Sequence, residues 1–405
     1  MLLRELLYCE FQINKLKRDS IWIHRISIYL SKICKITILI IAQGGFMNYK
    51  IGKLEAIFLI MIVMMNKILL NIPKEIIKQA KTGAPVNIIF TTILAVFIAC
   101  LICRLLKKFP NEDIIDIAHY VGKKPLQIII GIIFILLLSL TMLTAIYKFT
   151  DLLKMLYFSS TPVFLIFIAF FVCIGFANKI GFRGIVRANA IISVILLISL
   201  ALILYGTFQD YNFNRLYPLL GQNFENTFIK GAQNIFAYGG LLYLFLIQPF
   251  LKHKKDFKPV AIISIFISGF FLLSTSTSLL MLFPFISTSE ELMSMYLLTR
   301  SIVFGEFFQR IDAAFIFLWL IAAFSYSSIS AMFLNNIVKK ITNCKESNSF
   351  QYSILGILLA IIILFHNQTF FTFLEVIIYK YFILITLGLS ILLLIIANIK
   401  RKDKI

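Results

Sequence analysis

Long uninterrupted runs of apolar residues are the feature that most constrains what this chain can fold into. They recur along most of the chain at roughly 20 residues each, as in residues 259–283. A run of that length crosses a hydrocarbon core of about 30 Å as an α-helix, in which every backbone polar group is bonded within the segment. Hydrophobic residues make up 60% of the chain and charged residues only 14%, whereas a soluble domain has about 45–50% and 25%. The pattern predicts an all-α membrane protein.

We expect about ten transmembrane helices, which together form one permease-like membrane domain over residues 47–405. The predicted spans are residues 54–72, 86–106, 126–148, 161–178, 186–206, 232–251, 259–283, 310–335, 351–366 and 378–398. Proline and glycine cluster at many of the breaks between these runs, where they interrupt helices.

The first 46 residues differ from the rest of the chain, because they are basic and only patchily apolar. The segment 21–42 carries Arg25, Lys32 and Lys35, which makes it a poor span. Residues 43–47 read Gln-Gly-Gly-Phe-Met, and the codons CAA-GGA-GGA-TTT-ATG would place a ribosome-binding sequence before a start codon. We favour Met47 as the native start, with residues 1–46 a non-native extension; a disordered or amphipathic surface segment is the alternative.

The formal net charge of +20 is explained by the loops. On a soluble protein it would suggest nucleic-acid binding, but here the lysines and arginines lie in short loops between apolar runs, where they set orientation and contact anionic headgroups. If the segment before the first span is cytoplasmic, the inside loops carry 19 lysines and arginines and the outside loops carry 10. We therefore expect both termini to be cytoplasmic, and the partner to be the lipid bilayer rather than a nucleic acid.

Two predicted spans contain polar or glycine interruptions. The first span contains Met65-Asn66-Lys67 before Pro73, and the sixth contains Tyr238-Gly239-Gly240. If ten spans form a five-plus-five inverted repeat, these are the first helices of the two halves. Interrupted helices at corresponding positions mark the binding site in transporters built this way, because unpaired backbone groups are tolerated at membrane depth only where they face a cavity or a ligand. The pattern predicts interrupted helices 1 and 6 around a small-molecule pocket.

Each of these features also has a purely structural explanation. Gly239 and Gly240 would equally allow two helices to pack closely, and Lys67 could extend its side chain to the outer interface. Hydroxyl groups in the third and eighth spans either line the pocket or bond to the backbone of their own helix. The predicted ligand-binding residues are Met65, Asn66, Lys67, Thr144, Tyr238, Gly239, Gly240, Ser325 and Ser328.

The sequence carries no recognisable motif of enzymatic chemistry. It has no GxxxxGK[ST], HExxH or GxSxG motif, and its four histidines have no metal-binding spacing. Cys100 and Cys103 have CxxC spacing, but they lie within an apolar run with no second pair nearby, so we interpret them as small buried residues. We expect a protein that is not an enzyme and that uses no cofactor or metal.

Four stretches of the chain resemble the B subunits of the spore germinant receptors, which belong to the amino acid–polyamine–organocation superfamily of permeases. They are the first span with its terminal Pro73, residues 184–189 (Gly-Ile-Val-Arg-Ala-Asn), residues 216–221 (Leu-Tyr-Pro-Leu-Leu-Gly), and the stretch from residue 297 to Trp319. The family usually has glutamate in place of Asp312 and a small residue near Asn66, so the chain departs from the family there.

The resemblance implies a spore germination protein in the spore inner membrane. Such a subunit works with the A and C subunits of a germinant receptor, binds a small-molecule germinant, often an amino acid, and triggers germination. An ion-coupled amino acid secondary transporter is the alternative, because one scaffold hosts both activities. We further expect the segment 290–310 to be a lid or a partner-docking helix, or else a surface-lying helix without a partner.

Overall fold

The computed structural model describes residues 50–70, 72–221, 223–284, 294–302, 311–343 and 348–402, and helices fill most of each range. These ranges contain no strand, and their one isolated bridge joins Ile51 to Leu251. The predicted all-α class is confirmed. The predicted non-native segment 1–46 lies outside the described residues, as does much of the predicted lid.

The helices overlap every predicted span. They are α3 (Lys53–Leu70), α4 (Ile72–Ala80), η2 (Lys81–Gly83), α5 (Ala84–Leu106), α6 (Ile114–Leu156), α7 (Val163–Ile180), α8 (Phe182–Thr207), η3 (Phe208–Asp210), η4 (Phe213–Leu216), η5 (Glu225–Ile229), η6 (Lys230–Tyr238), α9 (Leu241–Ile247), η7 (Gln248–Phe250), η8 (Lys254–Asp256), α10 (Phe257–Leu282), α12 (Ser294–Arg300), α13 (Ile311–Thr342), α14 (Asn348–Leu364), α15 (Gln368–Ile377), η9 (Ile378–Phe382) and α16 (Ile383–Lys402).

Within the described residues, seven helical stretches are long and apolar enough to cross a membrane. The pair α14 and α15, bent by 119°, is an eighth candidate. The first predicted span falls outside this set because α3 carries Lys53, Glu55 and Lys67, and the sixth does so because it is divided among short helices. The chain is thus a multi-pass membrane protein, while the count of ten spans and the inverted repeat stay predictions.

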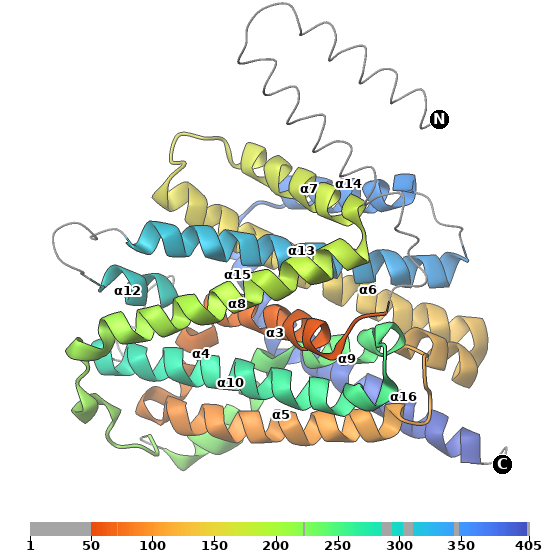
Figure 1. Ribbon diagram of the computed structural model, residues 1–405, viewed down its shortest axis with the longest axis horizontal. Coiled ribbons are helices and arrows are strands. Elements are labelled where there is room, and N and C mark those ends of the chain that lie inside the picture. The colour runs from red at the N-terminus through yellow and green to blue at the C-terminus, as the bar shows by residue number, and fades with distance from the viewer. Residues whose placement is uncertain are drawn as a thin grey trace, which may run out of the picture.

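Helix α13 lies at the centre of the bundle (Figure 1) and packs against α6, α8, α7 and α3. Small buried residues on α13, such as Ala322, Ala323 and Ser327, let neighbouring backbones come close. Helices α7 and α14 lie at one edge of the bundle and α5 and α10 at the opposite edge. The centre of the bundle is therefore filled by packed side chains. The edge helices expose apolar side chains such as Phe97 and Phe176.

Helix α6 is long because two helices join at a kink. Gly122 and Lys123 have non-helical dihedral angles, with Lys123 at φ 54°. The first helix begins at Asp113, whose carboxylate caps the backbone N–H groups of Ile115 and Asp116 at 3.1 and 3.0 Å. The cap fixes where this short first helix begins, and the kink separates it from the apolar span that follows.

The capped start of α6 is tied to two other elements. Lys340 at the end of α13 bonds to the fully buried Asp113 at 2.6 Å and also contacts Asp116. From the end of α16, Lys400 donates to the carbonyl of Val121 at 2.8 Å, and Arg401 lies over the ring of Phe109 at 5.0 Å. These contacts gather the α5–α6 connection, α13 and α16 at one end of the bundle, where the sequence places cytoplasmic loops.

Candidate functional site

The sixth predicted span is irregular for most of its length. A π-helical turn, η5, leads into the 3₁₀-helix η6, and a turn at Gly239 and Gly240 precedes α9. The backbone bonds here span three residues: Gly239 N–H donates to Phe236 at 3.0 Å, and Tyr243 N–H donates to Gly240 at 3.0 Å. Both glycines keep helical dihedral angles. The predicted interruption is therefore a change of helix type, and the chain is not unwound into an extended segment.

The first predicted span is helical through the polar pair at which the sequence predicts an interruption. Helix α3 continues through Asn66 and Lys67 to Leu70, and α4 starts at Ile72. The polar pair Asn66-Lys67 therefore does not interrupt α3, because its residues keep helical structure.

The first and sixth spans meet where the glycines lie. A Cβ atom on Gly239 would lie 2.7 Å from Nζ of Lys67, and one on Gly240 would lie 2.6 Å from Cγ of Met64. Lys67 is only 5% exposed, so its side chain lies within the protein rather than extending to the membrane interface. The glycines allow α3 to approach the sixth span closely, as the packing interpretation requires.

The other predicted binding residues are buried as well. Asn66 is fully buried, and neither its Oδ1 nor its Nδ2 has a hydrogen-bond partner within the described residues. The hydroxyl of Tyr238 bonds to that of Thr92 on α5, and Thr144 donates to Leu140 of its own helix at 3.0 Å. Met65 on α3 and Ser325 and Ser328 on α13 are also buried.

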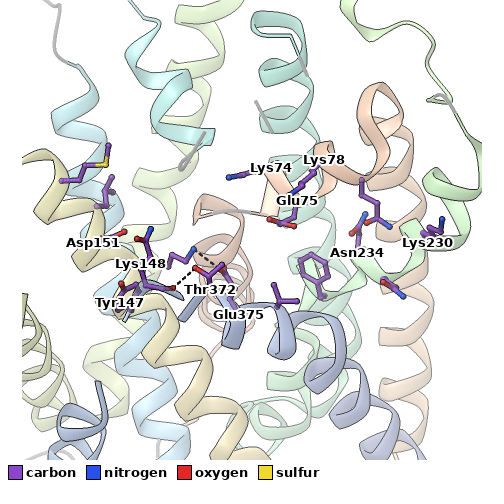
Figure 2. Close-up of a pocket in the computed structure, with 17 residues that line it drawn as sticks. Lys74, Glu75, Lys78, Tyr147, Lys148, Asp151, Lys230, Asn234, Thr372 and Glu375 are labelled. Carbon is purple, nitrogen blue, oxygen red and sulfur yellow. Dashed lines mark hydrogen bonds and ion pairs between the residues drawn. The ribbon is translucent and has the colours of Figure 1, made fainter. Parts of the chain in front are cut away.

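A cavity of about 770 Å³ opens beside these elements (Figure 2), and none of the nine predicted residues lines it. Four elements contribute side chains: α4, α6, η6 and α15. The lining residues are Lys74, Glu75, Lys78, Gln79, Tyr147, Lys148, Asp151, Leu152, Met155, Lys230, Gln233, Asn234, Phe236, Gln368, Thr372, Glu375 and Val376. The cavity connects to the predicted set through Phe236, whose carbonyl accepts the N–H of Gly239.

An ion pair joins α6 to α15 in the cavity wall. Nζ of Lys148 lies 2.9 Å from Oε2 of Glu375, and the two side chains are only 16% and 12% exposed (Figure 2). Next to it, the ring of Tyr147 stacks on that of Phe371 at 4.2 Å between centroids. A pair so little exposed is screened less by water than a surface pair, so it couples the two helices more strongly.

A buried amide network holds the irregular helix that forms the opposite wall. Nδ2 of Asn234 on η6 donates to Oδ1 of Asn87 on α5 at 2.8 Å, and Nδ2 of Asn87 donates to the carbonyl of Thr227 at 2.7 Å. Gly231 has no side chain where Asn87 approaches it. A π-turn leaves backbone groups without their usual partner, and Asn87 bonds to one such carbonyl, so η5 and η6 are fixed in place by α5.

Sequence reasoning missed the cavity residues on α15 because they fall in a segment that it treated as a loop. Gln368, Thr372 and Glu375 fall between the ninth and tenth predicted spans, yet they belong to α15. Their spacing of four and three residues puts them on one helical face. Polar residues at that spacing just before an apolar run could have predicted a helix whose polar face lines a cavity.

The sequence model of a family of spore germination proteins matches this chain over residues 50–372. No curated protein matches the chain. Among solved structures, a Na⁺-coupled sialic acid symporter in a substrate-bound, outward-open state is similar with a TM-score of 0.64 and 12% identity, covering 91% of this chain and 84% of that one. An Eremococcus coleocola manganese transporter bound to an aromatic bis-isothiourea substituted compound has a TM-score of 0.50 and 13% identity, covering 84% and 78%. These similarities show a transporter-like fold.

Proposed function

Because this chain belongs to the spore germination protein family, we propose that it is the membrane subunit of a germinant receptor and that the cavity between α4, α6, η6 and α15 binds the germinant. The predicted partners follow from the same membership: A and C subunits of the receptor, in the spore inner membrane. We also propose that both termini are cytoplasmic. The lysines that line the cavity all belong to the predicted outside set, which carries fewer positive charges than the inside loops.

The observation that carries this proposal is the mixture of charges around one small cavity. Four lysines and three carboxylates line it, together with apolar groups such as Leu152, Phe236 and Val376. A zwitterion needs an anion and a cation within one site, and an apolar wall accommodates a side chain. An amino acid has this chemistry, and the cavity is of ordinary size for a small molecule.

We assign the two charges of the ligand to the ion pair in the wall. The ammonium group of an amino acid would bind Glu375, and its carboxylate would bind Lys148, so the ligand replaces contacts that the two side chains otherwise make with each other. Charge-assisted hydrogen bonds in a little-exposed site are among the stronger polar contacts. Neither protein charge is left unpaired by the exchange, which avoids the large cost of an uncompensated buried charge.

A signal could leave the cavity along one continuous helical path. Helix α15 runs through the π-turn η9 into α16, and α16 ends at Lys400 and Arg401, which contact the α5–α6 connection. Separation or reorientation of Lys148 and Glu375 would act at the start of this path. Ligand binding would then shift the balance between two arrangements by as much as its affinity differs between them.

In this proposal, the nine residues predicted from sequence lie outside the cavity lining and support its wall. Lys67, Gly239 and Gly240 form the contact between α3 and the sixth span, and Phe236 joins that contact to the cavity wall. We propose that this contact transmits the effect of ligand binding and does not itself touch the ligand. The role of residues 290–310 as a lid or docking segment stays a proposal; α12 within it packs on α13 and α10.

Direct binding to the full chain in nanodiscs tests the site. Radiolabelled amino acids would be screened individually, and the best ligand measured against Glu375→Gln. We expect at least tenfold weaker binding, about 1.4 kcal/mol, because the ammonium partner is lost. Asp210→Asn is the control, since Asp210 is exposed and does not line the cavity. Equal affinities for both variants, or no binding of any amino acid, would refute the assignment.

The structural similarity to a Na⁺-coupled symporter supports a second candidate, an ion-coupled amino acid transporter. Uptake into proteoliposomes that contain this chain alone separates the two. Binding without accumulation is expected of a receptor subunit, and concentrative uptake driven by an ion gradient would establish the transporter. Deletion in the native spore, screened with a panel of amino acids and nucleosides, would identify the germinant.

A further inference from the structure

A second hollow, of about 350 Å³, lies between α7 and α14 at the edge of the bundle shown in Figure 1. One face of each helix lines it. Phe171, Gly175 and Lys179 lie on α7 with four-residue spacing, and Tyr352, Gly356 and Leu359 lie on α14 with spacing of four and three. The cavity proposed for the germinant shares none of these residues.

Two glycines create the hollow. A Cβ atom on Gly356 would meet nothing within 4 Å, and one on Gly175 would make only an ordinary contact of 3.5 Å with the ring of Tyr352. Facing glycines usually let two membrane helices touch. Here the space beside Gly356 stays open, so the glycines leave a groove along the pair instead.

The lining determines what can fill this groove. Apart from Lys179 and the hydroxyl of Tyr352, its side chains are apolar, and water needs several polar partners to occupy such a space. Phe176 and Val172 at its rim are 67% and 52% exposed, so the groove opens toward the hydrocarbon phase. An acyl chain matches both its polarity and its access.

The charge lies at one end only. Lys179 is exposed in the last turn of α7, and Tyr352 lies beside that end, whereas the groove continues through Leu359 without a charge. A cation at the membrane boundary attracts an anionic headgroup, and tyrosine is common at that depth. We propose that this groove, the α7–α14 groove, binds an anionic phospholipid, with one acyl chain along the glycines and the phosphate at Lys179.

Photo-crosslinking of the full chain tests this proposal. The chain would be reconstituted with phosphatidylglycerol or phosphatidylcholine that carries a diazirine in one acyl chain, and crosslinked peptides would be mapped. We expect crosslinks to α7 and α14 at least threefold more abundant with phosphatidylglycerol. Gly356→Leu should reduce them at least fivefold because leucine fills the groove, and Lys179→Gln should remove the preference for the anionic lipid.

The chain offers a matched control for the filling variant. Gly388 on α16 also has open space where a Cβ would stand, so Gly388→Leu should leave the α7 and α14 crosslinks unchanged. Equal yields with the two lipids, or unchanged yields in Gly356→Leu, would overturn the proposal. So would crosslinking in native membranes that joins this groove to the helix of another protein and not to lipid. Lipid binding is read without any germinant, so its failure is independent of the proposed receptor function.

Discussion

At the scale of single residues, the two adjacent glycines of the sixth span do different work. Gly239 faces the end of a flexible side chain, the ammonium of Lys67, whereas Gly240 faces Cγ of Met64, in the middle of a packed side chain. The lysine can move a few tenths of an ångström, but Met64 is fully buried within α3. The close approach between the two spans therefore depends on Gly240 more than on Gly239.

We expect Gly240→Ala to destabilise the protein by about 1–3 kcal/mol, as overpacking of a core does. Gly239→Ala should cost less, because Lys67 can yield. Thermal unfolding of the purified full chain in detergent would measure both. Gly388→Ala is the control, since its new methyl group would meet open space. Identical melting temperatures for Gly240→Ala and the control would show that the α3 contact tolerates a side chain.

Lys67→Met should change the response to germinant more than it changes protein abundance. It removes the ammonium group beside Gly239, at the contact that we propose transmits ligand binding. In spores that carry the variant as their only copy, the half-maximal germinant concentration should rise at least fivefold. Lys53→Met on the same helix is the control, because Lys53 is exposed. A normal response in Lys67→Met would limit Lys67 to filling space.

At the scale of elements, ion pairs and caps at the ends of helices fix how the long rods sit against one another. The carboxylate of Asp113 is buried and caps α6, and Lys340 brings the end of α13 to it. One interaction thus defines both the start of α6 and its contact with the central helix. Apolar packing alone would define the position of α6 along the axis of α13 less well, because similar side chains recur at every helical turn.

Lys340→Met should destabilise the protein by about 2 kcal/mol, less than the 3–5 kcal/mol of a fully buried pair, because the lysine is partly exposed while Asp113 is not. The variant leaves the buried carboxylate without its cation. Thermal unfolding of the full chain is the measurement, and Lys255→Met, at an exposed lysine between α9 and α10, is the control. Should the two variants unfold at the same temperature, the pair contributes nothing measurable.

At the scale of the whole molecule, the loops divide into two groups that the structure keeps apart. Contacts join the α5–α6 connection to the ends of α13 and α16, all of which belong to the predicted inside set. The large cavity instead collects Lys74, Lys78, Lys148 and Lys230 from the predicted outside set. The three-dimensional grouping agrees with the charge balance along the chain.

Cysteine labelling would establish the orientation. In a variant without native cysteines, Asn214→Cys should react with a membrane-impermeant maleimide in intact protoplasts, because the loop after α8 is proposed to be outside. Lys254→Cys should react only after permeabilisation. Both positions are exposed, so access depends on the membrane alone. The opposite pattern would invert the topology and place the 770 Å³ cavity on the inner side.

The sequence by itself determined the class of this protein, its multi-pass membrane character and its family, because apolar length and local motifs are properties of single segments. It also indicated that the sixth span is irregular, which the structure shows as a change of helix type at its glycines, whereas α3 stays helical through Asn66 and Lys67. Only the tertiary structure decided where the cavity lies. Lys148 and Glu375 are far apart in the chain, and their meeting depends on how α6 packs beside α15. No local pattern encodes that distance, since a cavity is defined by the side chains that four separate elements bring around one space.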